Sequence, residues 1–352
     1  MEFNKLLSFS LSLVLILSVA ESFDYDEKEL KTEEGMEAMY DRWRAHHKVS
    51  EKSPEKFNAF KATAQLVHNH NKLKKSYKLK INSLADMTNE EYRSAYTHQN
   101  LKLPGPGCPA CPACPAASGC PACPACPGAS GCPAAANAKD LPPRVDWREK
   151  NVISPPRWIS VDYMALTSIE AINAIRTGQN LVLSQHQVYH CKPTCKISDG
   201  IIFDFAKDTG IATLESYPPE IKGCDKSKFG KTLVTIDGNQ YPAASAPTEE
   251  AVMKAVAQQP ILVGFSGKDD EYKAYAGGIF SGPCGGEGKT ILIVGYDQDP
   301  DGTKYWIAKA AFEEDWGEKG YIRILRTPEG ICQMYTYTVM PLKSEETRNI
   351  EL

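Results

Sequence analysis

The feature that most constrains this chain is a proline-rich repeat near its middle. Residues 103–138 contain no charged residue, and within them residues 108–119 recur as residues 120–131 with Gly128 in place of alanine. Proline at every third position removes backbone donors, excludes helix and favours extended or polyproline-like backbone. Because no helix can run through such a segment, the chain divides into an N-terminal part and a longer C-terminal part.

Seven of the twelve cysteines belong to this repeat. At three residues per polyproline turn, the cysteines of each triplet would line one edge. Three interpretations stay open: a tolerated linker, a soft-metal site made of thiolates, and disulfide cross-links within the chain or to a partner. The seven residues are Cys108, Cys111, Cys114, Cys120, Cys123, Cys126 and Cys132.

The first residues carry the pattern of a secretory signal. Lys5 precedes an apolar stretch over residues 6–19, and Ala20 is a candidate border of the cleavage site. We predict a signal peptide over residues 1–20, because the apolar run is shorter than the roughly 20 residues of a spanning helix. A membrane anchor is the alternative. No other segment is long and apolar enough to span a bilayer, and a secretory route permits disulfides.

The net charge bears on the possible partners. The formal net charge is −4. A nucleic-acid or anionic-membrane binder would normally carry a basic excess. We therefore expect neither class of partner.

The two parts of the chain differ in their hydrophobic periodicity. Residues 21–102 are charged, with apolar residues at three- and four-residue spacing, which predicts two amphipathic helices. Residues 139–343 begin with a helical pattern over residues 163–175 and continue with alternating strand patterns, and residues 344–352 form a tail. Helices first and strands later indicate an α+β domain with segregated layers. The strand patterns cover residues 261–265, 290–296 and 305–308.

Several motifs of the C-terminal part identify a family. Residues 141–148 read Leu-Pro-Pro-Arg-Val-Asp-Trp-Arg and resemble the mature start of papain-like cysteine proteases. Further segments with this resemblance are residues 183–185, 215–218, 255–260, 275–279, 294–296, 305–307 and 316–323. The resemblance covers nearly all of residues 141–342. It implies an α+β, papain-like two-lobed fold, with a helical left lobe and a β-barrel-like right lobe.

The N-terminal part resembles the inhibitory propeptide of the same family. The residues that carry this likeness are Lys56, Phe57, Asn58, Phe60, Val67, Asn71 and residues 82–86. Thr63 and Leu84 depart from the usual Asn and Phe. The order of parts most resembles plant members with a KDEL-type tail, although the chain ends Asn349-Ile350-Glu351-Leu352. This implies the secretory pathway, with an extracellular, vacuolar or endoplasmic-reticulum destination.

The family's catalytic positions hold other residues here. The alignment places Ser160 at the nucleophilic cysteine, Lys289 at the histidine and Ala310 at the asparagine. Lys289 lies 129 residues (289 − 160) and Ala310 150 residues (310 − 160) beyond Ser160, within the roughly 130–150 of the family. The segment before Ser160 is about five residues shorter than the family's, and the oxyanion glutamine falls in the missing part. Ile197 and Ser198 occupy the positions of substrate-binding glycines.

From these replacements we predict a pseudo-protease that is not an enzyme but a binding or regulatory protein. Its expected partners are papain-like proteases or their inhibitors. One alternative is a carrier for the Cys-Pro repeat. Another is a hydrolase that uses Ser160 and Lys289, which would require Lys289 to lose its proton although Asp162 is a candidate ion-pair partner. His186 and His190 could face one way on a helix, but they lack the glutamate of a metallohydrolase.

The remaining cysteines are interpreted from the resemblance. It implies two disulfides, which join Cys191 to Cys224 and Cys284 to Cys332. The partner of Cys195 falls in the shortened segment, so Cys195 is either a free thiol or paired with a cysteine of the repeat. We expect no cofactor apart from a possible metal at the repeat.

Overall fold

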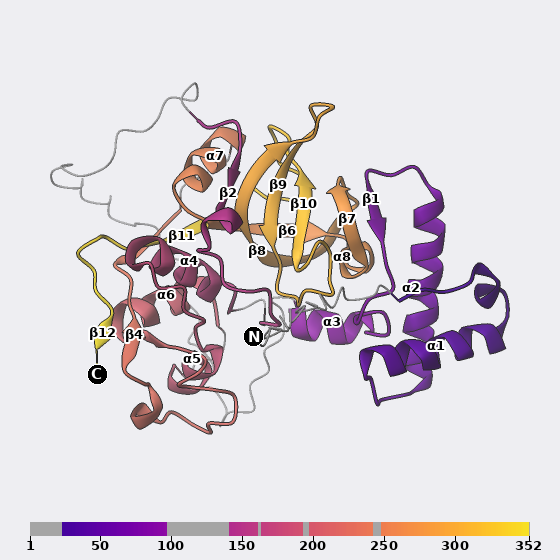
Figure 1. Ribbon diagram of the computed structural model, residues 1–352, viewed down its shortest axis with the longest axis horizontal. Coiled ribbons are helices and arrows are strands. Elements are labelled where there is room, and N and C mark those ends of the chain that lie inside the picture. Colours follow the sequence, from indigo (N-terminus) through magenta and orange to yellow (C-terminus); the bar gives the residue numbers. More distant parts are fainter. Residues whose placement is uncertain (1–22, 97–140, 161–162, 193–196, 242–247, 352) are drawn as a thin grey trace, which may run out of the picture.

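The computed structural model describes residues 23–96, 141–160, 163–192, 197–241 and 248–351 (Figure 1). The predicted signal peptide, the Cys-Pro repeat, Asp162 and Cys195 lie outside these residues. The helices are α1 (Glu33–His47), α2 (Pro54–Lys72), α3 (Asn89–Tyr96), α4 (Ala165–Thr177), α5 (Gln185–Cys191), α6 (Asp199–Asp208), α7 (Glu249–Gln258) and α8 (Asp269–Lys273).

The strands form two sheets. Their bounds are β1 (Tyr77–Leu79), β2 (Val145–Asp146), β3 (Ile211–Ala212), β4 (Thr232–Val234), β5 (Gly238–Gln240), β6 (Ile261–Gly267), β7 (Tyr275–Phe280), β8 (Cys284–Gln298), β9 (Lys304–Lys309), β10 (Tyr321–Leu325), β11 (Thr338–Leu342) and β12 (Ile350–Glu351). The larger sheet has the order β1-β7-β10-β9-β8-β6-β11-β5, and β2 pairs with β8. The smaller has the order β12-β4-β3.

The molecule has two lobes and a helical N-terminal unit. In Figure 1 the helices α4, α5 and α6 lie on the left, the large sheet occupies the centre, and α1 and α2 stand on the right. Helix α3 runs beneath the sheet toward the left lobe. The predicted α+β, two-lobed fold preceded by a helical propeptide is confirmed, as are the two amphipathic helices and the strands over residues 261–265, 290–296 and 305–308.

The propeptide shares its hydrophobic core with the β lobe. Tyr40, Trp43 and Phe60 are fully buried where α1 crosses α2, and their rings lie 4.9–5.7 Å apart. The indole nitrogen of Trp43 donates to the carbonyl oxygen of Asn82 at 2.9 Å. Strand β1 then pairs with β7, which places Tyr77 against Phe280 of the mature domain at 5.0 Å. One apolar cluster therefore runs through both units.

The start of α2 is fixed by a side-chain cap. Ser53 Oγ accepts a hydrogen bond from the backbone N–H of Lys56 at 3.2 Å, and Pro54 occupies the first helical position. Ser53→Ala is expected to lower the free energy of unfolding by about 1 kcal/mol, because an N–H at the helix start loses its acceptor. Urea denaturation measures this. The exposed Ser50→Ala is the matched control, and equal midpoints for both variants would contradict the capping role.

The helical lobe is built around α4. Every residue from Ala165 to Ala174 is buried, because α4 lies between α6, β6 and β11. The core of this lobe also includes Leu292 and Val294 of β8, so the long strand β8 contributes to both hydrophobic cores. The predicted helix over residues 163–175 is thus confirmed, with bounds shifted by two residues.

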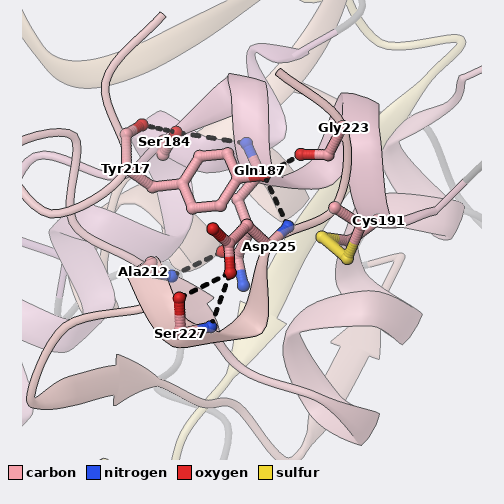
Figure 2. The surroundings of a disulfide bond; sticks show 9 residues. Ser184, Gln187, Cys191, Ala212, Tyr217, Gly223, Asp225 and Ser227 are labelled. Atoms are coloured by element: carbon pink, nitrogen blue, oxygen red, sulfur yellow. Dashed lines mark hydrogen bonds between the residues drawn. A yellow bond between two sulfur atoms is a disulfide. The ribbon is translucent and has the colours of Figure 1, made fainter. Parts of the chain in front are cut away.

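Two disulfides join cysteines of the described residues, and both follow the pairing that the family resemblance implies. Cys191 is bonded to Cys224, and Cys284 to Cys332. Figure 2 shows that the first closes the end of α5 against the loop that carries Asp225. The start of α5 is held as well, because the Ser184 hydroxyl donates to the carbonyl oxygen of Tyr217 at 2.6 Å and accepts from Gln187 N at 3.2 Å. Helix α5 is therefore tied down at both ends.

Within the described ranges, we find no helix with the length and apolar character needed to cross a membrane. The last described residues belong to the small sheet, since Ile350 of β12 pairs with Leu233 of β4. Lys343 Nζ donates to the carbonyl oxygen of Thr235 at 2.6 Å and to Asn349 Oδ1 at 3.0 Å, which holds this final segment on the helical lobe.

Candidate active site

The segment that leads to Ser160 rests on a buried ionic network. Glu170 of α4 is fully buried and accepts hydrogen bonds from Ser154 Oγ at 2.5 Å, from Arg157 at 2.5 Å and from the backbone N–H of Leu183 at 2.7 Å. Lys309 of β9 donates to Ser154 O at 2.7 Å, to Ser154 Oγ at 2.9 Å and to Pro155 O at 3.2 Å. Both lobes thereby hold this segment.

Lys289 does not meet Ser160. It lies on β8, is 3% exposed and forms an ion pair with Asp269 of α8 at 3.2 Å. Its ammonium group also donates to Glu287 O at 2.7 Å and to Gly267 O at 3.3 Å. Three N–H groups thus meet three acceptors. Burial lowers the pKa of Lys289, and Asp269 opposes this shift.

The alternative in which Ser160 and Lys289 act together as a catalytic pair is therefore wrong. The two side chains line different pockets, and the protons of Lys289 are engaged by other groups. Ala310, the third triad position, is fully buried at the end of β9 and carries only a methyl group. It can neither orient a base nor donate to substrate.

The propeptide covers the surroundings of Lys289. The Tyr92 ring lies 5.9 Å from Lys289 Nζ and 5.5 Å from Lys273 Nζ. Lys273 also donates to Asn89 Oδ1 at 2.9 Å and to Met87 O at 3.1 Å. Arg93 approaches Asp269 at 3.9 Å, so each side of the contact between α3 and the mature domain contributes a cation, Arg93 from α3 and Lys273 from the mature domain.

A pocket of about 350 Å³ opens between the lobes beside Lys289. Its lining is mostly apolar, and both lobes contribute to it. Ile197 to Asp199 form the side of the helical lobe, and the Tyr337 hydroxyl donates across the pocket to Asp199 Oδ2 at 2.7 Å. The β lobe supplies Gly264, Phe265, Ser266, Gly288, Lys289, Thr290, Gln333, Thr336 and Tyr337.

A second pocket, of about 330 Å³, contains Ser160. Gln185 and His186 of α5 line it together with Ser160, and the backbone N–H of Ser160 donates to Gln185 Oε1 at 3.3 Å. Burial lowers the pKa of His186, and His190 and Lys222 add to this shift, whereas Glu220 opposes it. Its remaining walls are Ser94, Ala95, Trp158, Tyr163 and Tyr189.

Two residues in or beside these pockets escaped the sequence analysis: Asp269, which pairs with Lys289, and Gln185, which lines the pocket of Ser160. Asp269, rather than the predicted candidate Asp162, is the described ion-pair partner of Lys289, and an acidic run at residues 269–271 was its only signal. Gln185 belongs to a recognised family motif, but nothing in that motif points to Ser160. His186 was weighed only as a metal ligand with His190. The described part of the chain holds no group of three His, Cys, Asp or Glu residues placed to bind a metal.

Known proteins resemble both parts of this chain, the N-terminal helical unit and the two-lobed domain. The profile "Papain family cysteine protease" matches residues 141–342, and "Cathepsin propeptide inhibitor domain (I29)" matches residues 40–92. A cysteine protease of Ambrosia artemisiifolia, Amb a 11.0101, is 37% identical over 98% of this chain and 90% of its own length. A KDEL-tailed cysteine endopeptidase of Arabidopsis thaliana is 36% identical over 97% of this chain and 95% of its own.

Solved proform structures share the architecture. The proform of Amb a 11, a ragweed pollen allergen, superposes with a TM-score of 0.75 at 33% identity, over 92% of this chain and 99% of that one. The stem bromelain precursor superposes with a TM-score of 0.70 at 25% identity, over 88% and 99%. Two lobes with a propeptide packed on them define the proform of a peptidase. The chain belongs to the papain family of cysteine proteases.

These findings correct the functional prediction made from the triad positions. We predicted a non-catalytic pseudo-protease, yet relatives that match almost the whole chain are named cysteine proteases and endopeptidases. That prediction rested on the substituted triad, oxyanion and substrate-binding positions, whereas the lobes, the interlobe pocket and the propeptide are present as a complete assembly. The expectation that the chain is not an enzyme, and the alternative of a mere carrier for the Cys-Pro repeat, are wrong for the same reason.

Proposed function

We propose that this chain is the proform of a papain-family peptidase that hydrolyses polypeptides bound between its two lobes. The observation that carries the proposal is the interlobe pocket, which has walls from both lobes and is large enough for one side chain of an extended peptide. No cysteine lies between Cys132 and Cys191, so hydrolysis requires another nucleophile in this part of the chain.

The lining of the pocket supports a preference for apolar side chains. Phe265 and Ile197 supply apolar walls, and the carboxylate of Asp199 is already hydrogen-bonded by Tyr337. Gly288 leaves space at the rim, because a Cβ built there would meet nothing within 4 Å. A bulky apolar residue of the substrate therefore fits without displacing a charged group.

The contacts of α3 support a role for the propeptide as the inhibitor of this site. Helix α3 covers Lys289 and Lys273 and forms a wall of the pocket that contains Ser160. Removal of the propeptide would expose the two lysines and open the pocket that contains Ser160. We also infer that the protein enters the secretory pathway, which the predicted leader, the two disulfides and the KDEL-tailed relative support.

The test is peptide hydrolysis by the processed protein. A specific protease site is introduced within residues 103–138, the full chain is cleaved there, and the propeptide is separated by size exclusion. We expect the processed protein to cleave a peptide mixture close to bulky apolar residues, because these residues occupy the pocket. Mass spectrometry of the products identifies the cleaved bonds. Gly288→Leu should raise KM about tenfold by filling the pocket. Gly200→Leu, on α6 and equally unobstructed, is the control. An uncleaved mixture would contradict the proposal.

A further inference from the structure

We propose that Ser160 is the nucleophile of this hydrolysis, with His186 as its general base and Gln185 as a donor to the developing oxyanion. The inference rests on the proposed function and assigns its catalytic groups. The three residues line one pocket, and that pocket is distinct from the one that contains Lys289. A hydroxyl, an imidazole and a carboxamide are the three kinds of group that acyl transfer requires.

The carboxamide of Gln185 is held next to Ser160. Its oxygen accepts the backbone N–H of Ser160 at 3.3 Å, which leaves the amide nitrogen to donate. Gln185 is thereby tied to the residue whose hydroxyl would attack. An oxyanion that forms on a carbonyl attacked by Ser160 would arise beside this nitrogen, where a fixed donor is most effective.

Helix α5 is rigid enough to hold such a site. The hydroxyl of Ser184, directly before Gln185, donates to Tyr217 O, and Gln187 Oε1 accepts from Ala212 N at 2.6 Å (Figure 2). The Cys191–Cys224 disulfide fixes the other end of the helix. Catalytic groups act well only when their supports fix them within a fraction of an ångström, and α5 has supports at both ends.

The surroundings of His186 favour a base rather than a cation. The imidazole is partly buried, with His190 and Lys222 as cationic or titratable neighbours and Glu220 as the opposing carboxylate. Burial and the two basic neighbours lower the pKa of the ring and so favour its neutral form, which a general base requires.

The reaction is balanced with water as the second reactant. Ser160 Oγ bonds to the carbonyl carbon of the peptide while His186 takes the hydroxyl proton. The C–N bond breaks, the proton passes from His186 to the leaving amine, and an ester of Ser160 remains. Water then attacks this ester, His186 takes a proton from the water and returns it to Ser160 Oγ, and the carboxylic acid leaves.

The experiment uses the cleaved full chain freed of its propeptide. Ser160→Ala and His186→Gln should each lower kcat/KM for peptide and ester substrates about 10³-fold or more, and the double variant should lose no more than Ser160→Ala alone, because the pair acts as a unit. Gln185→Ala should cost about 10²-fold. Ser227→Ala, an exposed substitution outside this pocket, should match the parent protein. A fluorophosphonate should label Ser160, as read by peptide mass spectrometry.

Ser160→Cys keeps the site assayable if Ser160→Ala misfolds. Its thiol should be alkylated by iodoacetamide, and the rate should fall about tenfold or more when His186→Gln is added, because the base generates the thiolate. Hydrolysis that survives Ser160→Ala would overturn this assignment and leave the proposed function standing. Loss in Ser160→Ala without loss in His186→Gln would overturn the base. If the parent protein shows no hydrolysis and no labelling, both the assignment and the proposed function are wrong.

Discussion

Replacing Glu170 with alanine is expected to lower the free energy of unfolding by about 3–5 kcal/mol, because it breaks a buried ionic network by removing its only carboxylate. The substitution leaves the Arg157 guanidinium, which is 19% exposed, without its 2.5 Å partner and removes the acceptor of the Leu183 N–H. Urea denaturation followed by tryptophan fluorescence measures the loss.

Two further variants make this expectation specific. Glu170→Gln keeps the volume and can still accept from Leu183 N, so its loss should be smaller than that of Glu170→Ala. Glu149→Ala removes a carboxylate that pairs with Arg144 at 2.5 Å but is 61% exposed, and it should leave the denaturation midpoint unchanged. If Glu170→Ala and Glu149→Ala lower the free energy of unfolding equally, burial of the network contributes nothing to stability.

The second large effect concerns the pH dependence of stability. Burial lowers the pKa of Lys309 from its ordinary value near 10.5 to about 7, with Glu170 opposing the shift and Arg157 adding to it. Between these two values the unfolded chain binds a proton that the folded protein does not bind. Raising the pH from 7 to 10.5 therefore favours the folded state, and the destabilisation by Lys309 is greatest below pH 7.

Lys309→Met should abolish this contribution. The parent protein should gain stability relative to Lys309→Met by about 1.4 kcal/mol per pH unit in the middle of the window, and hence by about 2 kcal/mol between pH 8 and 9.5. Urea denaturation of both proteins across this range measures the difference. Lys304 is exposed on the same strand, and the stability of Lys304→Met should depend on pH in the same way as that of the parent protein. If the stability of Lys309→Met changes with pH as that of the parent protein does, Lys309 stays protonated over the whole range and the prediction is wrong.

Local patterns predicted the elements well and their contacts less well. The spacing of Phe57, Phe60 and Val67 predicted α2, and alternation over residues 290–296 predicted the buried stretch of β8. Both are properties of one segment and its buried face. The register between distant strands is not such a property. The pairing of β1 with β7 and the ion pair of Lys289 with Asp269 therefore required the structure.

The candidate site shows the same division. The resemblance correctly gave both disulfide pairings among the described cysteines. It did not indicate that the backbone N–H of Ser160 donates to Gln185, because this contact joins two segments that are separate in the sequence. The error in the functional class came from treating the substitutions at the catalytic and substrate-binding positions as decisive for a whole protein.

Strand β1 also protects the sheet. It is the outermost strand and covers β7, whose Gly278 has a φ of 91° and no side chain to keep a neighbouring backbone away. When the propeptide leaves, the N–H and C=O groups of β7 that faced β1 lose their partners, and an unpaired strand edge recruits other extended chains. Removal of the propeptide would thus leave this strand edge open to other extended chains, and its timing would decide how long the edge stays uncovered.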